Sequence, residues 1–263
     1  MTRRIKRHKD FEISLQIKND AFIRPPRDSQ RNWLLNKAVT EFADNLVALD
    51  RLAQRFVPGV DALPTADRTQ AALGDNEIME DWQIPLMSAM ADAVTASHGH
   101  VLEIGFGRGV ASTLIQQRGV RSHTIIECND TIVDRYEAWR TDFADSDTRM
   151  VHGRWQNVLG GLGEFDGIFF HTYPLNEEEF LEQIGDSTTF ADHFFSHAAD
   201  HLVAGGVFSY LTNEIESLSR MHQKLLFEHF SHLDLQVIRN LPIPPDTADA
   251  WWSDSMVIVA AVK

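Results

Sequence analysis

Cysteine is nearly absent from the sequence, and long apolar runs are missing altogether. The single thiol, Cys128, rules out a disulfide within the chain, so we expect a reducing, cytoplasmic setting. No run of 18 apolar residues occurs, so no segment is predicted to span a membrane. The basic N-terminus is not followed by the apolar stretch of a signal peptide, so none is predicted.

Positive charge is scarce as well. The 263 residues include 24 Lys and Arg against 38 Asp and Glu, which gives a net charge of −14. This balance argues against general nucleic-acid binding and is compatible with cationic ligands. Residues 1–31 are the exception, with nine Lys or Arg against four Asp or Glu. A nucleic-acid arm is one interpretation of this segment; we favour a solvated tail or an arm laid on an acidic neighbouring subunit.

Residues 101–109, Val-Leu-Glu-Ile-Gly-Phe-Gly-Arg-Gly, are the most informative stretch, and an apolar run follows over residues 110–115. An apolar segment that breaks into a glycine-rich turn before a helical pattern predicts a buried parallel strand, a loop and a helix. Glycines lack the Cβ atom where a ligand or another backbone comes close. Three of them alternate in the turn: Gly105, Gly107 and Gly109.

Glu103 lies two residues before the first of these glycines. Its carboxylate would repel the phosphate that dinucleotide-binding loops hold at a helix N-terminus, and it suits a ligand with an amine and a sulfonium. The G-x-G-x-G spacing also differs from the G-x-G-x-x-G of those loops. A tight turn without a ligand, as in any α/β domain, is the alternative.

A second acidic residue, Glu127, ends the predicted strand 122–127, about 20 positions after the glycine loop. This is the place where such architectures hold ribose hydroxyls, because a carboxylate accepts from two neighbouring hydroxyls at once. The glycine loop and Glu127 together leave two cofactor classes, NAD and S-adenosylmethionine (SAM), and Glu103 favours SAM. Cys128 is then a packed neighbour of the cofactor rather than a nucleophile.

From residue 77 onward, predicted strands alternate with helices, which indicates an α/β fold with a doubly wound, mainly parallel sheet. The last two strands have no helix between them and predict a terminal antiparallel hairpin, the shape of class I, Rossmann-like methyltransferases. The predicted strands are 100–104, 122–127, 148–152, 165–171, 206–212, 234–239 and 254–262. The predicted helices are 77–97, 109–118, 130–144, 176–184, 189–203 and 214–230. Pro85 should kink or restart the first of them.

The N-terminal quarter is predicted to be an extension of this domain. We expect an extended arm over residues 1–28, an amphipathic helix over 30–57 and a loop with a short helix over 60–76. The helix covers the main domain or pairs across a homodimer, and we favour the dimer. The predicted division is therefore an arm and helical extension over residues 1–75 and a SAM-dependent methyltransferase domain over residues 76–263.

Ligands of such sheets bind outside the carboxyl ends of the strands. Trp155 follows the third strand there and either flanks an adenine or is an ordinary core tryptophan. A stripe of three histidines, His193, His197 and His201, recurs every four residues. Zinc is one interpretation of the stripe, and we favour partly buried histidines without a metal. Gly205 and Gly206 are predicted to form the turn into the strand that follows.

Several motifs are more specific than the glycine loop. They are Met79-Glu80-x-Trp82 with Pro85 and Met87, residues 101–107, Ile125-Ile-Glu-Cys-Asn-Asp130, Phe165-Asp-Gly-Ile168 and Thr172-Tyr-Pro-Leu175. With them, the chain from about residue 77 onward resembles guanidinoacetate N-methyltransferase. Gly153-Arg-Trp-Gln156 is most similar to the fungal-type protein arginine methyltransferases of that lineage.

The resemblance implies SAM as the cofactor and S-adenosylhomocysteine as its product. With Glu103 added for its charge, the expected cofactor residues are Met79, Met87, Glu103, Gly105, Phe106, Gly107, Arg108, Gly109, Glu127, Cys128, Asn129, Arg154 and Trp155. The family places two carboxylates around the guanidinium of its substrate. This chain has Gln83 and His171 at those positions, so either the substrate is not a guanidine or the acid has moved.

The segment after the fifth predicted strand offers a moved acid. We expect Glu214 to bind the guanidinium, His171 to accept or relay its proton and Tyr173 to orient the acceptor nitrogen. Glu80 is a second candidate acid, Asn213 a further substrate contact, and a mere pocket-wall role the alternative for His171. The predicted function is SAM-dependent N-methylation of a small guanidino compound, most simply free L-arginine. Guanidinoacetate, another amine, a peptide arginine, and SAM binding without catalysis are the alternatives; neither nucleic acid nor membrane is expected as a partner.

Overall fold

The computed structural model describes residues 68–69, 71–175, 179, 189–215, 217–245 and 254–263. They belong to one of the two compact units into which the chain divides, Leu63–Lys263. The predicted arm 1–28 and helix 30–57 lie outside the described residues, as does most of the predicted helix 176–184. No helix in the described part is both long and apolar enough to cross a membrane.

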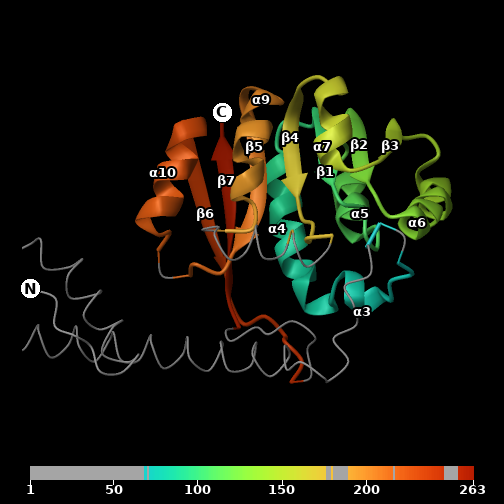
Figure 1. Ribbon diagram of the computed structural model, residues 1–263, viewed down its shortest axis with the longest axis horizontal. Helices are drawn as coiled ribbons and strands as arrows, with labels where there is room; N and C mark the ends of the chain where they lie inside the picture. Colours follow the sequence, from blue (N-terminus) through green and yellow to red (C-terminus); the bar gives the residue numbers. More distant parts are fainter. Residues whose placement is uncertain (1–67, 70, 176–178, 180–188, 216, 246–253) are drawn as a thin grey trace, which may run out of the picture. The chain divides into compact units, whose positions relative to one another are not determined.

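A seven-stranded sheet with the order β3-β2-β1-β4-β5-β7-β6 forms the centre of the domain (Figure 1). The first five strands are parallel, and β7 runs antiparallel to both of its neighbours, β5 and β6. This arrangement confirms the predicted class I methyltransferase fold. The strands are β1 (His100–Ile104), β2 (Ser122–Glu127), β3 (Thr148–His152), β4 (Phe165–Phe170), β5 (Leu202–Thr212), β6 (His232–Ile238) and β7 (Met256–Val262).

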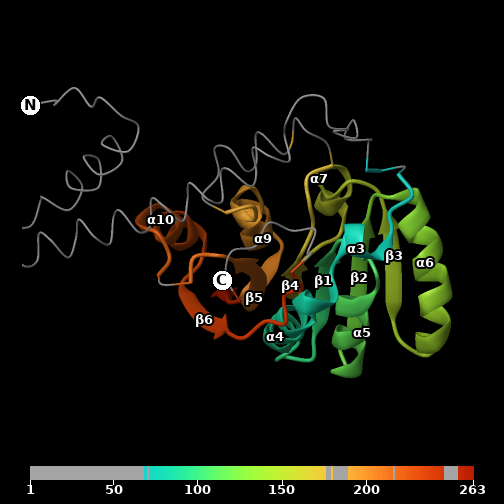
Figure 2. The same ribbon diagram turned by 90° about the horizontal axis from the view of Figure 1, so that it is seen from below.

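Helices cover both faces of the sheet, which is why its central strands are apolar on both sides. Figure 2 shows α4 and α5 on one face and α9 and α10 on the other. Leu102, Ile104 and Phe170 point toward the α9 face, whereas Val101 and Phe169 point toward α4. The helices are α3 (Asp75–Ile78), α4 (Ile84–Val94), α5 (Val110–Gln117), α6 (Asp130–Arg140), α7 (Trp155–Val158), α9 (Phe195–Asp200) and α10 (Arg220–His229).

Short 3₁₀ turns adjoin four of these helices: η1 (Asp81–Gln83), η2 (Thr141–Phe143), η3 (Leu159–Gly161) and η5 (Asp192–Phe194). A side-chain cap explains where α6 begins, and a proline explains where α4 begins. Asn129 Oδ1 accepts from the backbone N–H groups of the first turn of α6. Pro85 lies in the first turn of α4, where the helix begins again. The single predicted helix 77–97 is therefore divided into α3, η1 and α4.

Two predicted boundaries around β5 were wrong. The strand begins at Leu202 rather than residue 206, and Gly205 and Gly206 lie inside it. The pairing with β4 shifts between Phe165 and Gly167, and Gly205 has a φ of 78°, so these glycines belong to a β-bulge instead of a turn. Helix α10 begins at Arg220 rather than residue 214, because Ser219 caps it by accepting from the N–H of His222.

Candidate cofactor site

Two adjoining pockets open at the carboxyl edge of the sheet, where β1, β2 and β4 end. They share Gly105, Glu127, Cys128, Thr172, Tyr173 and Leu175 and therefore form one crevice. Most of the predicted cofactor residues line it: Met79, Met87, Gly105, Phe106, Gly107, Arg108, Glu127, Cys128, Asn129, Arg154 and Trp155. The sequence motifs thus converge on one place, as the rule for parallel sheets requires.

Glu127 organises the loops at this edge. Its Oε2 accepts from the backbone N–H of Phe106 at 2.9 Å and from that of Gly107 at 3.4 Å. Its Oε1 accepts from the N–H groups of Cys128 at 2.7 Å and Asn129 at 2.9 Å. Glu127 is 8% exposed and still lines both pockets, so its carboxylate joins the glycine loop to the end of β2 at the wall of the crevice.

The glycine loop approaches its neighbours too closely for larger residues. Gly105 has a φ of 90°, and a Cβ atom there would lie 2.8 Å from the carbonyl oxygen of His171. Gly109 has a φ of 75°, and a Cβ atom there would lie 2.9 Å from Cζ of Phe106. Gly109 does not line either pocket; it gives Phe106 room to pack edge-on against Tyr136 and Trp139.

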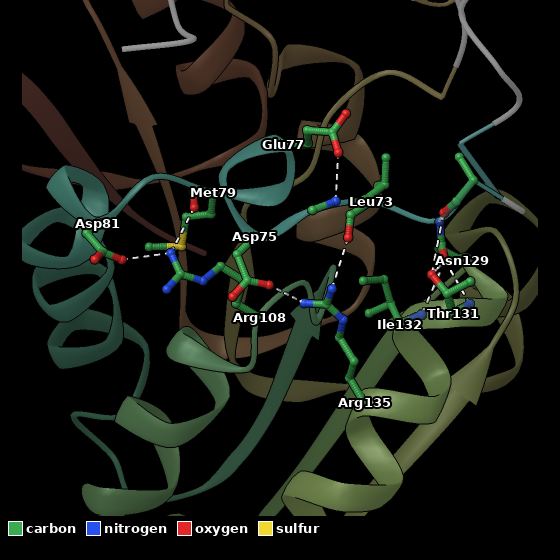
Figure 3. A network of polar contacts seen from close by, with 12 residues as sticks. Leu73, Asp75, Glu77, Met79, Asp81, Arg108, Asn129, Thr131, Ile132 and Arg135 are labelled. Atoms are coloured by element: carbon green, nitrogen blue, oxygen red, sulfur yellow. Dashed lines mark hydrogen bonds and ion pairs between the residues drawn. The ribbon is translucent and has the colours of Figure 1, made fainter. Parts of the chain in front are cut away.

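A segment before the first strand crosses the carboxyl edge next to the glycine loop. We call residues 71–83 the crossing segment; Figure 3 shows the polar contacts that hold it. Arg108 donates to the carbonyl oxygen of Met79 at 2.9 Å and pairs with Asp81 at 2.7 Å. Arg135 of α6 pairs with Asp75 at 2.7 Å and donates to the carbonyl oxygen of Leu73 at 2.9 Å.

The second pocket is lined by α7 and by the segment that follows β4. Trp155 lines it and also packs against Phe194 and His197, so this tryptophan belongs both to the pocket wall and to the core. Its contact with an adenine stays a prediction. Arg154 forms a close ion pair with Glu179, whose other oxygen accepts from the N–H of Leu175 at 2.9 Å.

Two of the three striped histidines thus pack against Trp155, His193 with a ring distance of 5.7 Å and His197 with 5.1 Å. The third, His201, contacts the carbonyl oxygen of Gly163 through Nδ1. Within the described residues, no group of three or more His, Cys, Asp or Glu side chains has the arrangement of a metal site.

The residues after β4 form the other end of the crevice. Gln83 donates to the hydroxyl oxygen of Tyr173 at 3.4 Å, and the rings of His171 and Tyr173 lie 5.6 Å apart, edge to face. Burial lowers the pKa of His171 from its usual 6.5 to about 4. His171 is therefore neutral at pH 7, and its imidazole is too weak a base to take a proton from a guanidinium.

Besides Gly109 and Gln83, four predicted site residues do not line the crevice. Glu103 is fully buried on the α5 side of the sheet, where its Oε2 accepts from Ser112 at 2.5 Å and lies 3.0 Å from Nε2 of His123. Glu80 accepts from the indole N–H of Trp82 at 2.8 Å. Neither carboxylate lines the two pockets, nor do Asn213 and Glu214.

Glu214 is instead part of a buried chain of hydrogen bonds. One of its oxygens is bonded to Nδ1 of His222, and the other accepts from the N–H of Ser219 at 3.1 Å. Nε2 of His222 is in turn bonded to the hydroxyl of Tyr210. His222 and Tyr210 are buried, and burial together with the nearby Glu214 carboxylate raises the pKa of Tyr210. The chain ties the loop after β5 to the start of α10.

The crevice fits the parts of SAM by its own chemistry. Glu127 presents a carboxylate to hydroxyl donors, and Met79, Met87 and Phe169 supply apolar surface. Burial and the charge of Glu127 raise the pKa of Cys128 to about 12, so this thiol is an uncharged packing group at pH 7.

Further lining residues were not among the predicted site residues: Arg68, Leu73, Ile78, Val110, Ala111, Ile132, Phe169, Thr172, Leu175, Gln156, Glu179, Phe190 and His193. Most are apolar residues without a chemical signature. Among the polar ones, Glu179 could have been indicated by the acidic run of residues 177–179, which begins one residue after the Thr-Tyr-Pro-Leu motif.

The sequence is similar to those of known methyltransferases. The chain is 27% identical over 155 residues to Protein arginine N-methyltransferase 2 of Yarrowia lipolytica, covering 55% of this chain and 30% of that protein. It is 31% identical over 113 residues to the protein of the same name from Aspergillus fumigatus, covering 41% of this chain and 26% of that one. The chain thus spans less than a third of the length of these relatives.

Among solved structures, the fold is similar to that of the N-methyltransferase NodS from Bradyrhizobium japonicum, crystallised with S-adenosylhomocysteine. The TM-score is 0.51 at 11% identity, and the match covers 70% of this chain and 89% of that one. A family model described as guanidinoacetate N-methyltransferase matches residues 59–231, well over half of the sequence. The chain therefore belongs to the guanidinoacetate N-methyltransferase family, in line with the SAM-dependent methyltransferase that the sequence resemblance implied.

Proposed function

We propose that the protein transfers a methyl group from SAM to a guanidino nitrogen, with free L-arginine as the acceptor. The supporting observation is the single crevice in which Glu127 and the glycine loop meet the Thr172–Leu175 corner. When bound, SAM supplies an activated methyl group on its sulfonium. The residues proposed to hold it are those of the predicted set that line the crevice, with Glu127 accepting from the ribose hydroxyls.

Neutral groups face the proposed acceptor end. The hydroxyl oxygen of Tyr173 accepts from Gln83, and we propose that this hydroxyl orients the acceptor nitrogen. Because its pKa is about 4, His171 adds no positive charge next to a sulfonium. Each methyl transfer to a guanidinium releases one proton, and this proton must pass to water or to a group other than His171.

A guanidinium next to a sulfonium requires a countercharge. Glu214 is held by His222 and Ser219 outside the pocket lining, so the predicted acceptor role no longer suits it. We propose Glu179 in its place, because its carboxylate lines the crevice beside Tyr173 and its side chain is only 15% exposed. The ion pair with Arg154 would hold this carboxylate at the crevice, where its oxygens can be shared with the acceptor.

The names of the relatives favour a second acceptor, an arginine side chain of a protein. Tyr173 is 38% exposed, so the proposed acceptor end is open to solvent. The homodimer and the cytoplasmic setting remain predictions from the sequence.

A mass-spectrometric assay tests the acceptor. The full chain is incubated with SAM and, in separate reactions, free arginine, guanidinoacetate or an arginine-containing peptide. We expect N-methylarginine from the first reaction. If only the peptide were methylated, the acceptor would be a protein arginine and not free arginine. No methylation of any guanidino compound would overturn the proposal.

Two isosteric variants test the countercharge. Glu179→Gln should raise the KM for the acceptor about tenfold or more, because a charge-assisted hydrogen bond contributes about 1.5–3 kcal/mol. Glu214→Gln should leave this KM unchanged and lower stability instead. The reverse pattern would return the acceptor role to Glu214.

A further inference from the structure

The crossing segment is one side of the cofactor pocket. Leu73, Ile78 and Met79 line the pocket from this segment, whereas Glu127 and Asn129 line it from the end of β2. A ligand in this pocket has the sheet edge on one side and the crossing segment on the other. Its release therefore depends on how firmly the crossing segment is held.

The crossing segment contains little structure that could hold it in place alone. Helix α3 has four residues and η1 has three, both far shorter than helices that are stable without outside contacts. Asn129 and Thr131 donate to the carbonyl oxygen of Ala71, and Met79 and Trp82 are buried in the core. Two arginines from the sheet domain add the charged outside contacts. Arg108 comes from the glycine loop and Arg135 from α6, and each combines an ion pair with a hydrogen bond to a backbone carbonyl of the segment.

These contacts are reversible. The side chains of Asp75 and Asp81 are 63% and 76% exposed, so water and salt screen both ion pairs. The pair with Arg135 holds the Asp75 carboxyl in its charged form, and its pKa lies below the usual value as a result. Two weak contacts of this kind can hold a segment closed on average and still allow it to open.

We propose that Arg108 and Arg135 are positioning residues that hold the crossing segment over the cofactor and so set the rate at which the cofactor is released. Arg108 occupies a glycine loop and would be expected to face the ligand, but its guanidinium is bonded to Met79 and Asp81. The inference rests on SAM as the cofactor and not on the identity of the acceptor. It is tested without any acceptor, so its failure is distinguishable from failure of the proposed function.

The main test compares Asp75→Asn/Asp81→Asn with the unchanged chain. Neither aspartate lines the pocket, so the variant alters the contacts of the segment and not the lining. Stopped-flow displacement of S-adenosylhomocysteine should give a dissociation rate about threefold to tenfold higher, with an unchanged melting temperature of the ligand-free protein. A rate equal to that of the unchanged chain would overturn the proposal.

Asp92→Asn is the matched control. Asp92 pairs with Arg118 at 2.7 Å and is 69% exposed, so the pair resembles Asp81–Arg108 in length and exposure, but neither residue lines the crevice. The dissociation rate of S-adenosylhomocysteine from the Asp92→Asn variant should equal the rate from the unchanged chain. An equal acceleration in this variant would show a general charge effect and would count against the proposal.

A charge exchange and a salt series keep the proposal testable if the double variant does not fold. Asp75→Arg and Arg135→Asp should each accelerate release, and their combination should restore most of the original rate. For the unchanged chain, raising NaCl from about 0.05 M to about 0.5 M should accelerate release, because screening weakens exposed pairs. The proposal would be overturned if the two substitutions accelerated release additively when combined. It would also be overturned if the dissociation rate of the unchanged chain did not depend on salt.

Discussion

Glu127 has a structural role besides the ribose contact predicted for it. Its carboxylate accepts four backbone N–H groups of the surrounding loops. Glu127→Ala should therefore abolish tight SAM binding and also lower the free energy of unfolding by about 1–3 kcal/mol, because buried donors lose their acceptor.

Calorimetry with SAM and urea denaturation measure the two effects separately. Glu127→Gln is the control, since its amide oxygen still accepts from one pair of N–H groups. Unchanged stability of Glu127→Ala would show that water replaces the carboxylate in the loops.

His171 gives a pH prediction with a defined sign. Its pKa is about 4 in the folded chain against the usual 6.5, so between these values the unfolded chain binds a proton that the folded chain does not. The free energy of unfolding should therefore fall as the pH drops through this window, and His171→Gln should make the fall shallower. Urea denaturation across the pH range measures the difference. An NMR titration of His171 with a midpoint near 6.5 would contradict it.

At the scale of elements, local patterns predicted the strands better than the helices. The bounds of β1, β2 and β3 match the prediction residue for residue, because a polar or glycine-rich turn ends each of these short strands. Helix starts depend on which side chain caps them. The predicted helix 214–230 began too early because Glu214 bonds to His222 and the cap is Ser219.

The same reasoning explains the site. The convergence of the predicted cofactor residues on one crevice was predictable because the glycines and Glu127 form a pattern along the chain. The acceptor half of the site was not, since the positions of Glu214 and Glu179 depend on partners that only the fold brings close, His222 and Arg154.

Gly109 provides a test of element packing. At a φ of 75°, Gly109→Ala adds backbone strain, and the new Cβ atom would meet Phe106 at 2.9 Å and Trp139 at 3.3 Å. Gly119 is a matched control with a φ of 72° and no atom within 4 Å of its Cβ position. We expect Gly119→Ala to cost about 1–2 kcal/mol and Gly109→Ala about 1–3 kcal/mol more. If chemical denaturation gave the same loss in free energy of unfolding for both variants, the aromatic cluster around Phe106 would accommodate the added methyl group without cost.

At the scale of the whole molecule, the sequence of residues 30–57 predicts a strongly apolar helical stripe that includes Trp33, Phe42 and Leu49. Such a stripe needs a partner, and we expect a second copy of the chain. Deletion of residues 1–57 should therefore convert a dimer into a monomer in light scattering. A monomer both before and after the deletion would remove the dimer prediction.

The sheet order has a consequence for how the domain assembles. Strand β6 comes before β7 in the chain, yet β7 lies between β5 and β6. Within the described residues, β6 has no other strand to pair with, so it joins the sheet only together with or after β7. Folding of this edge therefore cannot follow the order of the sequence. A fluctuation that frees β7 from β5 would release both strands at once, and their amide hydrogens should exchange with solvent as one cooperative unit.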